Sequence, residues 1–212
     1  QFTLFGCSLP GGQLSELSVN GRPLEKLNVK IALPADPSTQ QPMNGRVDPE
    51  QAFMDAVEYR VHGPRAFSNS VSVGITTTPV VLEVESNNTP QQAQKLTPPC
   101  EVAGQFYPER DYDWYSFEAK QNDTWTIEVI SHRLGLPTDA QLVIHQITVD
   151  DKGEEQVKVL PTADDIGTRD RAQFDTRTGD AAYQFTAPVD GLYRVRVRDG
   201  FSALQSDPRL VY

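Results

Sequence analysis

Within residues 191–199, GLYRVRVRD, apolar and charged side chains alternate without interruption from Tyr193 to Arg198. Tyr193, Val195 and Val197 fall on one side, and three arginines fall between them on the other. Successive side chains of a β-strand point to opposite faces of its sheet. This segment therefore predicts a strand with one face in a core and the other in solvent.

The same period of two recurs along the chain and is broken by turn residues. Trp125, Ile127 and Val129 share one face of a predicted strand, and Tyr115 and Phe117 share a face of another. Sixteen prolines and fourteen glycines among 212 residues disfavour long helices and favour many short strands. The predicted fold class is therefore all-β, and the pattern divides near residue 82 into two segments.

Residues 1–82 form the first predicted domain. Short strands are expected within 2–6, 17–21, 27–34, 57–61 and 68–79. Val29, Ile31 and Leu33 alternate within one of them, and Asn20-Gly21 is a turn dipeptide. A polar loop is expected at 34–46. One short helix is expected within 48–59, with Asp48 as cap, Pro49 in the first turn and Gln51 at the capping-box position.

Three stretches of this segment, FTLFGCSLPGG, LSVNGRPL and SNSVSVGI, resemble immunoglobulin-like domains of the IPT/TIG type. The resemblance covers most of residues 1–82 and implies an immunoglobulin-like β-sandwich.

Residues 83–212 form the second predicted domain, with strands at regular spacing and a hairpin turn expected at Asp190-Gly191. EVESNNTPQQAQKL, VAGQFYPERDYDWYSFEAK, HRLGLPTDAQLVI and YQFTAPVDGLYRVRVRD follow one another in the order seen in the bacterial pre-peptidase C-terminal domain, which this segment resembles. The resemblance implies a jelly-roll β-sandwich that accompanies a secreted hydrolase. The tandem is also similar to large secreted or surface proteins of planctomycete-type bacteria.

Oxygen-bearing side chains gather where the two segments meet. Glu83, Glu85 and Asn87 alternate, so an extended chain would project all three to one side. Asp111 and Asp113 alternate in the same way before Trp114. Calcium takes six to eight oxygen ligands, and the family resemblance implies calcium at this start and this loop. The predicted metal ligands are Glu83, Glu85, Asn87, Asn88, Asp111 and Asp113. A solvated acidic linker without metal is the alternative, and Asn88 departs from the aspartate usual in the family.

Aromatic side chains offer a second kind of site. Tyr107 and Tyr112 lie in a predicted loop, YPERDY, and are the candidates for contact with a carbohydrate or a peptide. Trp125 alternates with apolar residues, which favours burial. Thr89, Pro90 and Gln92 predict a short helical turn.

Nothing in the sequence predicts a catalytic centre. His62, His132 and His145 have no metal-ligand spacing, and His132 is expected to pack near Arg133 at a strand end. Asp164, Asp165, Asp170 and Asp175 lack the spacing of a calcium loop and predict a solvated loop. Cys7 and Cys100 are read as small buried thiols, with a disulfide between them as the alternative.

The formal net charge of −10 argues against nucleic acid as a partner, and no stretch is apolar for long enough to span a membrane. We therefore expect a non-catalytic accessory, adhesion or spacer module of a larger exported bacterial protein. Its expected location is extracellular, at the cell surface or periplasmic. Its expected partners are other domains of the parent protein and extracellular polysaccharide or protein. The alternative is a carbohydrate- or peptide-binding targeting module of a secreted hydrolase.

Overall fold

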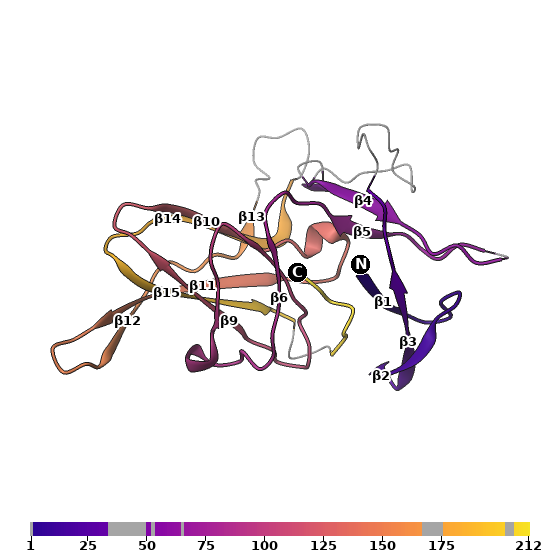
Figure 1. Cartoon of the computed structure of the whole chain (residues 1–212), viewed down its shortest axis with the longest axis horizontal. Helices are drawn as coiled ribbons and strands as arrows, with labels where there is room; N and C mark the ends of the chain where they lie inside the picture. The colour runs from indigo at the N-terminus through magenta and orange to yellow at the C-terminus, as the bar shows by residue number, and fades with distance from the viewer. Residues whose placement is uncertain (1, 34–49, 52–53, 65, 167–175, 202–205) are drawn as a thin grey trace.

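The structure is a computed structural model that describes residues 2–33, 50–51, 54–64, 66–166, 176–201 and 206–212. The chain is all-β, as the sequence predicts, and the described residues contain no α-helix (Figure 1). Two short 3-10 helices, η3 (Pro90–Gln92) and η4 (His132–Leu134), accompany the strands. The strands are β1 (Phe2–Gly6), β2 (Gln13–Val19), β3 (Arg22–Val29), β4 (Ala56–Tyr59), β5 (Val71–Gly74), β6 (Val80–Leu82), β7 (Gln94–Lys95), β8 (Glu101–Ala103), β9 (Asp113–Ala119), β10 (Thr124–Glu128), β11 (Ala140–Val149), β12 (Glu155–Val159), β13 (Asp165–Ile166), β14 (Thr178–Thr186) and β15 (Gly191–Asp199).

A five-stranded and a three-stranded sheet enclose the main core. The larger sheet has the order β12-β11-β15-β9-β7, and the smaller has the order β10-β14-β13. Tyr193 is fully buried and Val195 and Val197 are each 5% exposed, which confirms the inward face predicted for β15. Phe117 stacks on Tyr193 with ring centroids 5.9 Å apart. Trp125, for which the sequence predicts burial, is partly buried and packs against this core, with its ring centroid 5.2 Å from that of Phe117.

The predicted hairpin at Asp190-Gly191 is wrong. β14 and β15 lie in different sheets, so the segment between them crosses from one layer of the sandwich to the other. The Asp190 carboxylate instead accepts hydrogen bonds from the Gln121 amide at 2.7 Å and from Lys120 Nζ at 3.1 Å. Asp190 therefore joins two connections at the same end of the sandwich.

The first 82 residues contribute separate small sheets. β1, β3 and β2 form one sheet, and β2 and β3 are joined at Asn20-Gly21, where positive φ values of 50° and 74° confirm the predicted turn. The strand expected at 27–34 is displaced, because β3 ends at Val29 and Leu33 is 58% exposed.

The helix expected within 48–59 is wrong at its C-terminal end, where Ala56–Tyr59 is strand β4 and pairs with β5. Asp48, Pro49 and the loop at 34–46 lie outside the described residues.

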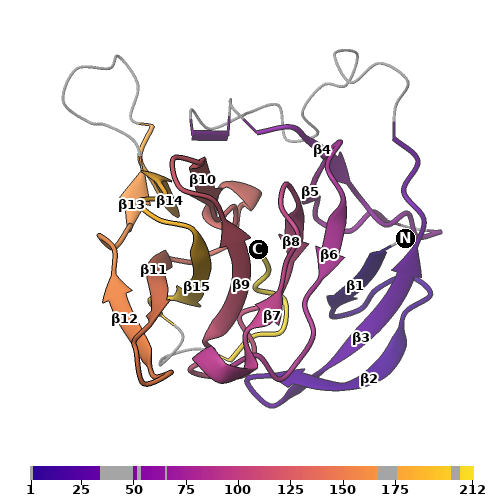
Figure 2. The same ribbon diagram turned by 60° about the vertical axis from the view of Figure 1, so that its left-hand side comes forward.

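The two predicted domains are connected by hydrogen bonds at their boundary. β6 pairs in parallel with β8, so strands from both sides of residue 83 lie side by side (Figure 2). The immunoglobulin-like and jelly-roll assignments and the boundary at 82/83 stay predictions. Cys7 and Cys100 are free thiols, and Cys7 is exposed rather than buried as expected.

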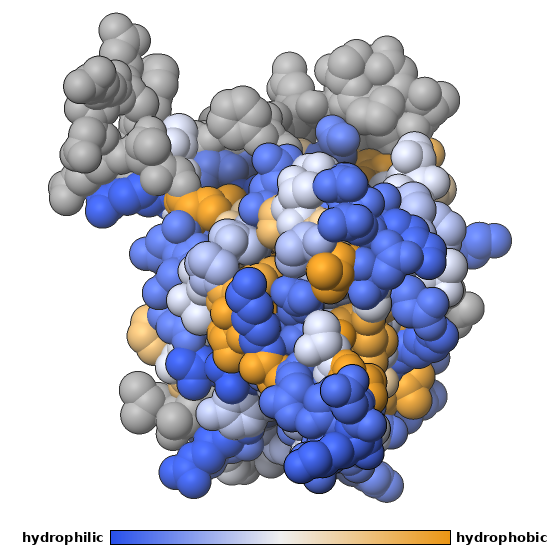
Figure 3. All heavy atoms as spheres, turned by 90° about the vertical axis from the view of Figure 1, so that its left-hand side faces the viewer, coloured by the Kyte–Doolittle hydropathy of each residue, from blue (hydrophilic) through white to orange (hydrophobic). Residues whose placement is uncertain are grey.

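The β11–β12 hairpin projects from the far end of the sandwich, and β12 is exposed along its whole length (Figure 1). Val149, Val157 and Val159 are each more than half exposed there. Figure 3 shows this end of the molecule, where hydrophobic residues are interspersed with hydrophilic ones.

Candidate metal centre

The segment after β6 is held in an extended path beside the sandwich. The Glu83 amide donates to the Ala103 carbonyl at 3.1 Å. The Gln94 carboxamide accepts from the Val84 amide at 2.8 Å and donates to the Leu82 carbonyl at 2.9 Å, as a neighbouring strand would. Leu82 and Val84 face solvent, so Glu83 and Glu85 project to the opposite side, as their alternation predicts.

Three carboxylates meet where this segment passes the start of β9. Glu83, Glu85 and Asp113 each place an oxygen within 4.8 Å of the other two. Asp113 is fully buried, Glu83 is half-buried and Glu85 is exposed. The site therefore has a buried floor and one open side.

Asn87 forms a further wall of the site. It is fully buried, its carbonyl accepts from the Trp114 amide at 2.9 Å, and its Nδ2 lies 3.4 Å from Glu83 Oε1. Its amide N–H donates to Glu85 Oε2 at 3.2 Å. These bonds tie the acidic segment to the start of strand β9. The side-chain oxygen of Asn87 has no hydrogen-bond partner among the described residues.

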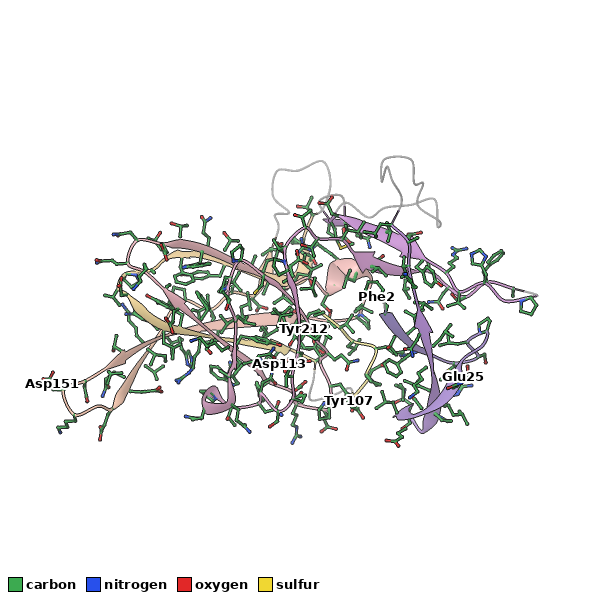
Figure 4. The ribbon with its side chains drawn as sticks, viewed as in Figure 1. Phe2, Glu25, Tyr107, Asp113, Asp151 and Tyr212 are labelled. Carbon is green, nitrogen blue, oxygen red and sulfur yellow. The ribbon has the colours of Figure 1, made fainter. Side chains whose placement is uncertain are left out.

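Two tyrosines from distant parts of the chain converge on Glu83. The hydroxyls of Tyr115 and Tyr212 lie 3.1 and 2.9 Å from Glu83 Oε1 and 2.6 Å from each other. Two hydroxyl protons can serve two of these three contacts at once. The Gln105 amide donates to the other oxygen, Oε2, at 2.9 Å. Figure 4 shows Tyr212 and Asp113 close together near the middle of the molecule.

Asp111 organises the loop before β9. Its two oxygens accept from the Tyr107 amide at 3.0 Å and from the Tyr112 amide at 3.1 Å, and the residue is 3% exposed. Burial, then the charges of Glu85 and Glu83, raise the pKa of Asp111 to about 7. Asp111 therefore shapes the loop through these hydrogen bonds and lies close enough to Glu85 and Glu83 to interact with their charges.

Asp113 is the most strongly perturbed carboxyl group of the site. Burial, and then the close carboxylate of Glu83, raise the pKa of Asp113 to about 10, against a smaller lowering by the nearby Tyr212 hydroxyl. Burial also raises the pKa of Tyr115 and of Tyr212. A carboxylate in such surroundings either keeps its proton or requires a cation beside it.

Three buried side-chain oxygens of Asp113 and Asn87 are not used by the protein, whereas both oxygens of Glu83 accept hydrogen bonds. Both carboxylate oxygens of Asp113 and the Oδ1 of Asn87 are buried without a hydrogen bond in the described part of the chain. The neighbouring Tyr212 hydroxyl is directed at Glu83 and Tyr115 instead. Among the described residues, no Lys or Arg forms an ion pair with the four carboxylates of the site.

The structure brings together Glu83, Glu85, Asn87, Asp111 and Asp113, as the sequence predicts, but not Asn88. The Asn88 side chain is exposed and has no hydrogen bond to these groups in the described part of the structure. The predicted turn after it is present as η3, where the Thr89 hydroxyl donates to Gln92 Oε1 at 2.8 Å.

Sequence reasoning missed Tyr115, Gln105 and Tyr212. The spacing of Tyr115 from Asp113 could have revealed it, because residues two apart on a strand share a face. No local pattern points to Tyr212, since 129 residues separate it from Glu83.

The predicted ligand-binding tyrosines are both half-buried. Tyr107 takes part in the Asp111 loop through its backbone, whereas the Tyr112 ring lies 5.3 Å from the Arg196 guanidinium. His132 begins η4 next to Arg133, and its Nδ1 lies 3.0 Å from the Thr178 hydroxyl.

A second acidic group, Asp139, Asp164 and Asp165, also brings carboxylate oxygens within 4.8 Å. Asp164 and Asp165 are both exposed, but Asp165 lies in strand β13 rather than in the predicted loop, and Asp170 and Asp175 lie outside the described residues.

In the described ranges, no helix combines the length and hydropathy needed to cross a membrane. A comparison of the chain with protein-family models finds no match, and a comparison with curated proteins finds none that is significantly similar.

Proposed function

We propose that this chain is a non-catalytic β-module that binds a calcium ion at the site formed by Glu83, Glu85, Asn87 and Asp113, with Asp111 close behind. The observation that carries the proposal is the state of Asp113. A fully buried carboxylate with both oxygens unpaired, beside two further carboxylates, is costly unless a cation or a proton neutralises it.

The chemistry of the donors favours calcium over other metals. Every side chain at the site offers oxygen, and neither His nor Cys takes part, which suits a hard cation. Magnesium is usually held by one or two carboxylates and keeps several waters, whereas calcium accepts many protein oxygens in flexible geometry. Three carboxylates, the Asn87 amide oxygen and an open side for water match calcium best.

Calcium at this position would rigidify the segment that joins the two predicted domains. The segment runs from β6 to η3 and is already tied to β8 and β9 by backbone hydrogen bonds. A cation that binds only the folded chain adds to its stability by mass action. We propose that the module serves as an accessory, adhesion or spacer unit of an exported bacterial protein, outside the cytoplasm where calcium is plentiful.

Thermal unfolding with calcium, with magnesium and with chelator tests the proposal. At a calcium concentration about 100 times the dissociation constant, the melting temperature should rise by about 5–10 °C over chelator, and magnesium should give a smaller rise. Terbium should bind in place of calcium and luminesce on excitation of Tyr115 and Tyr212, whose hydroxyls lie at the site.

Matched variants assign the effect to this site. Glu85→Gln should abolish most of the calcium-dependent rise, whereas Asp165→Asn, in the second acidic group, should leave it intact. An unchanged melting temperature at millimolar calcium would count decisively against the proposal.

A further inference from the structure

The outward face of β15 carries three arginines that differ in their partners. Arg194 forms a two-pronged ion pair with Glu155, with nitrogen–oxygen distances of 2.7 and 2.8 Å. Arg198 donates from Nε to Gln141 Oε1 at 2.7 Å. Arg196, between them, has no carboxylate partner among the residues that the structure describes.

Aromatic rings hold Arg196 in place instead. Its guanidinium carbon lies 5.3 Å from the centre of the Tyr112 ring and 5.8 Å from that of Trp114. Trp114 is buried and is backed by the His145 ring at 5.0 Å. Cation–π attraction therefore orders the guanidinium without neutralising it. Its Nε is buried without an acceptor, which leaves the outer nitrogens as the groups available to a ligand.

A second positive charge lies over the same ring. The Arg198 guanidinium carbon is 5.9 Å from the centre of the Tyr112 ring. Burial, and then the charge of Arg198, lower the pKa of Arg196, so the two cations oppose one another. An anion bound between the two guanidiniums would offset both the burial of the Arg196 charge and its repulsion by Arg198.

The acidic character of the whole chain does not cancel this local charge. Charges further away than about 8 Å are largely screened at physiological ionic strength. The acidic side chains on the same sheet face are already occupied, Glu155 by Arg194 and Glu118 by Lys95 at 3.1 Å.

We propose that the surface formed by Tyr112, Arg196 and Arg198 binds an acidic polysaccharide, with a carboxylate or sulfate between the two guanidiniums and a sugar ring against the part of Tyr112 that they leave exposed. A planar guanidinium matches both anions in a two-pronged geometry, and a half-exposed aromatic ring provides a flat apolar platform. This goes beyond calcium binding and does not depend on it.

The position of the surface favours a glycan over a peptide. Peptides that bind sheets usually add a strand at a free edge or lie in a groove. β15 lies between β11 and β9, so the strand that carries Arg196 and Arg198 has no free edge. A flat sheet face with an aromatic ring suits a sugar ring better than an extended backbone.

Isothermal titration of the full chain, in chelator so that calcium cannot bridge, tests this. The probes are an oligogalacturonate, a sulfated oligosaccharide and a neutral oligosaccharide of equal length, with oligoglutamate as the acidic peptide. The chain should bind one or both charged glycans and not the neutral one. Arg196→Gln should weaken binding by about tenfold or more, because a charge-assisted contact is lost. Tyr112→Ala should weaken it in the same direction.

Arg194→Gln is the matched control, because this arginine lies on the same face of the same strand but is already paired. It should leave glycan affinity within about twofold, since no contact is lost. Arg196→Lys is the substitute test if Arg196→Gln does not fold. It keeps the positive charge but loses the planar guanidinium, so it should also weaken binding.

Three results would overturn the proposal. One is the absence of binding to either charged glycan. Another is an unchanged affinity in the Arg196 variants, or an equal loss in Arg194→Gln, which would reduce the effect to net charge. The third is equal or tighter binding of oligoglutamate, which would assign the surface to acidic peptides.

Discussion

The Tyr212 hydroxyl lies 2.9 Å from Oε1 of Glu83, although the two residues are 129 positions apart in the chain. Two backbone hydrogen bonds hold Tyr212 in place. Its amide donates to the Gly104 carbonyl at 3.1 Å, and its carbonyl accepts from the Gly104 amide at 3.0 Å. The last described residues of the chain therefore hold the first carboxylate of the candidate metal centre in place.

Asp113→Asn should separate the metal role of this residue from its structural role. The amide resembles the protonated carboxyl, which is the form that a pKa of about 10 favours in the metal-free protein. The variant should melt at or above the wild-type temperature in chelator, and should lose the rise of about 5–10 °C that calcium gives to the wild type. Differential scanning calorimetry measures both.

Asp151→Asn is the control for Asp113→Asn, because Asp151 is an exposed acidic residue in the turn between β11 and β12 (Figure 4). It should retain the full calcium response. An Asp113→Asn protein that still responds to calcium would exclude this residue as a ligand.

The pH dependence of stability should have an unusual sign in the metal-free protein. The folded pKa values of Asp111 and Asp113, about 7 and about 10, lie above their ordinary value of 3.8. The folded chain then binds more protons than the unfolded chain between pH 4 and these values, so each group lowers stability as pH rises through that window. Urea unfolding in chelator between pH 5 and pH 7 measures the slope.

The comparison for this slope is the Asp113→Asn variant, because other carboxylates titrate in the wild type as well. Stability of the variant should fall less, or rise more, with pH than that of the wild type. Calcium should become a tighter ligand as pH rises, since binding expels protons. Parallel slopes for the two proteins would refute the assignment.

Tyr212→Phe should weaken calcium binding without removing a ligand. Glu83 would lose one hydroxyl partner and keep Tyr115 and the Gln105 amide. A hydrogen bond to a charged group contributes about 1.5–3 kcal/mol, so the dissociation constant should rise by about tenfold to a hundredfold. Calorimetric titration with calcium measures this, and an unchanged constant would show that the hydroxyl does not position Glu83.

Gly104→Ala should disturb the same site from the opposite side. A Cβ at Gly104 would lie 2.5 Å from Cζ of the Tyr212 ring, so the ring must shift from the position in which its hydroxyl contacts Glu83. Calcium affinity should fall at least as far as in Tyr212→Phe. Gly74→Ala is the control, since nothing lies within 4 Å of a Cβ there. If Gly104→Ala binds calcium normally, the ring position does not matter.

Asp180→Ala should be among the most destabilising single changes. Asp180 is fully buried and accepts from the Ser131 and His132 amides at 2.8 and 2.6 Å and from Arg133 Nε at 2.7 Å. Its loss leaves the buried Arg133 charge with only its partly exposed partner Glu128, and should cost about 3–5 kcal/mol in urea unfolding. Asp190→Ala, at an exposed position, should cost little.

The strands of the sandwich could be predicted from local patterns because burial of one face imposes a period of two. The alternation in β15 identified its buried apolar residues but not the burial of Arg194, and the alternation of Glu83 and Glu85 identified one side of the candidate metal centre. The prediction failed at Asp190-Gly191, where the same turn chemistry serves a hairpin or a crossing between sheets. At Ala56–Tyr59 the local patterns predicted both the end of a helix and the start of a strand, and pairing with β5 decided for the strand.

By itself the sequence determined that the chain is all-β and that acidic side chains gather where the two predicted domains meet. The reason is that residues two apart on an extended chain point to the same side. Only the tertiary structure decided which distant groups complete that acidic cluster. Tyr212 reaches Glu83, and Asp113 is enclosed beside it, through the packing of strands far apart in the chain. Local spacing carries no record of such contacts, since they depend on the order of the strands in the sheets.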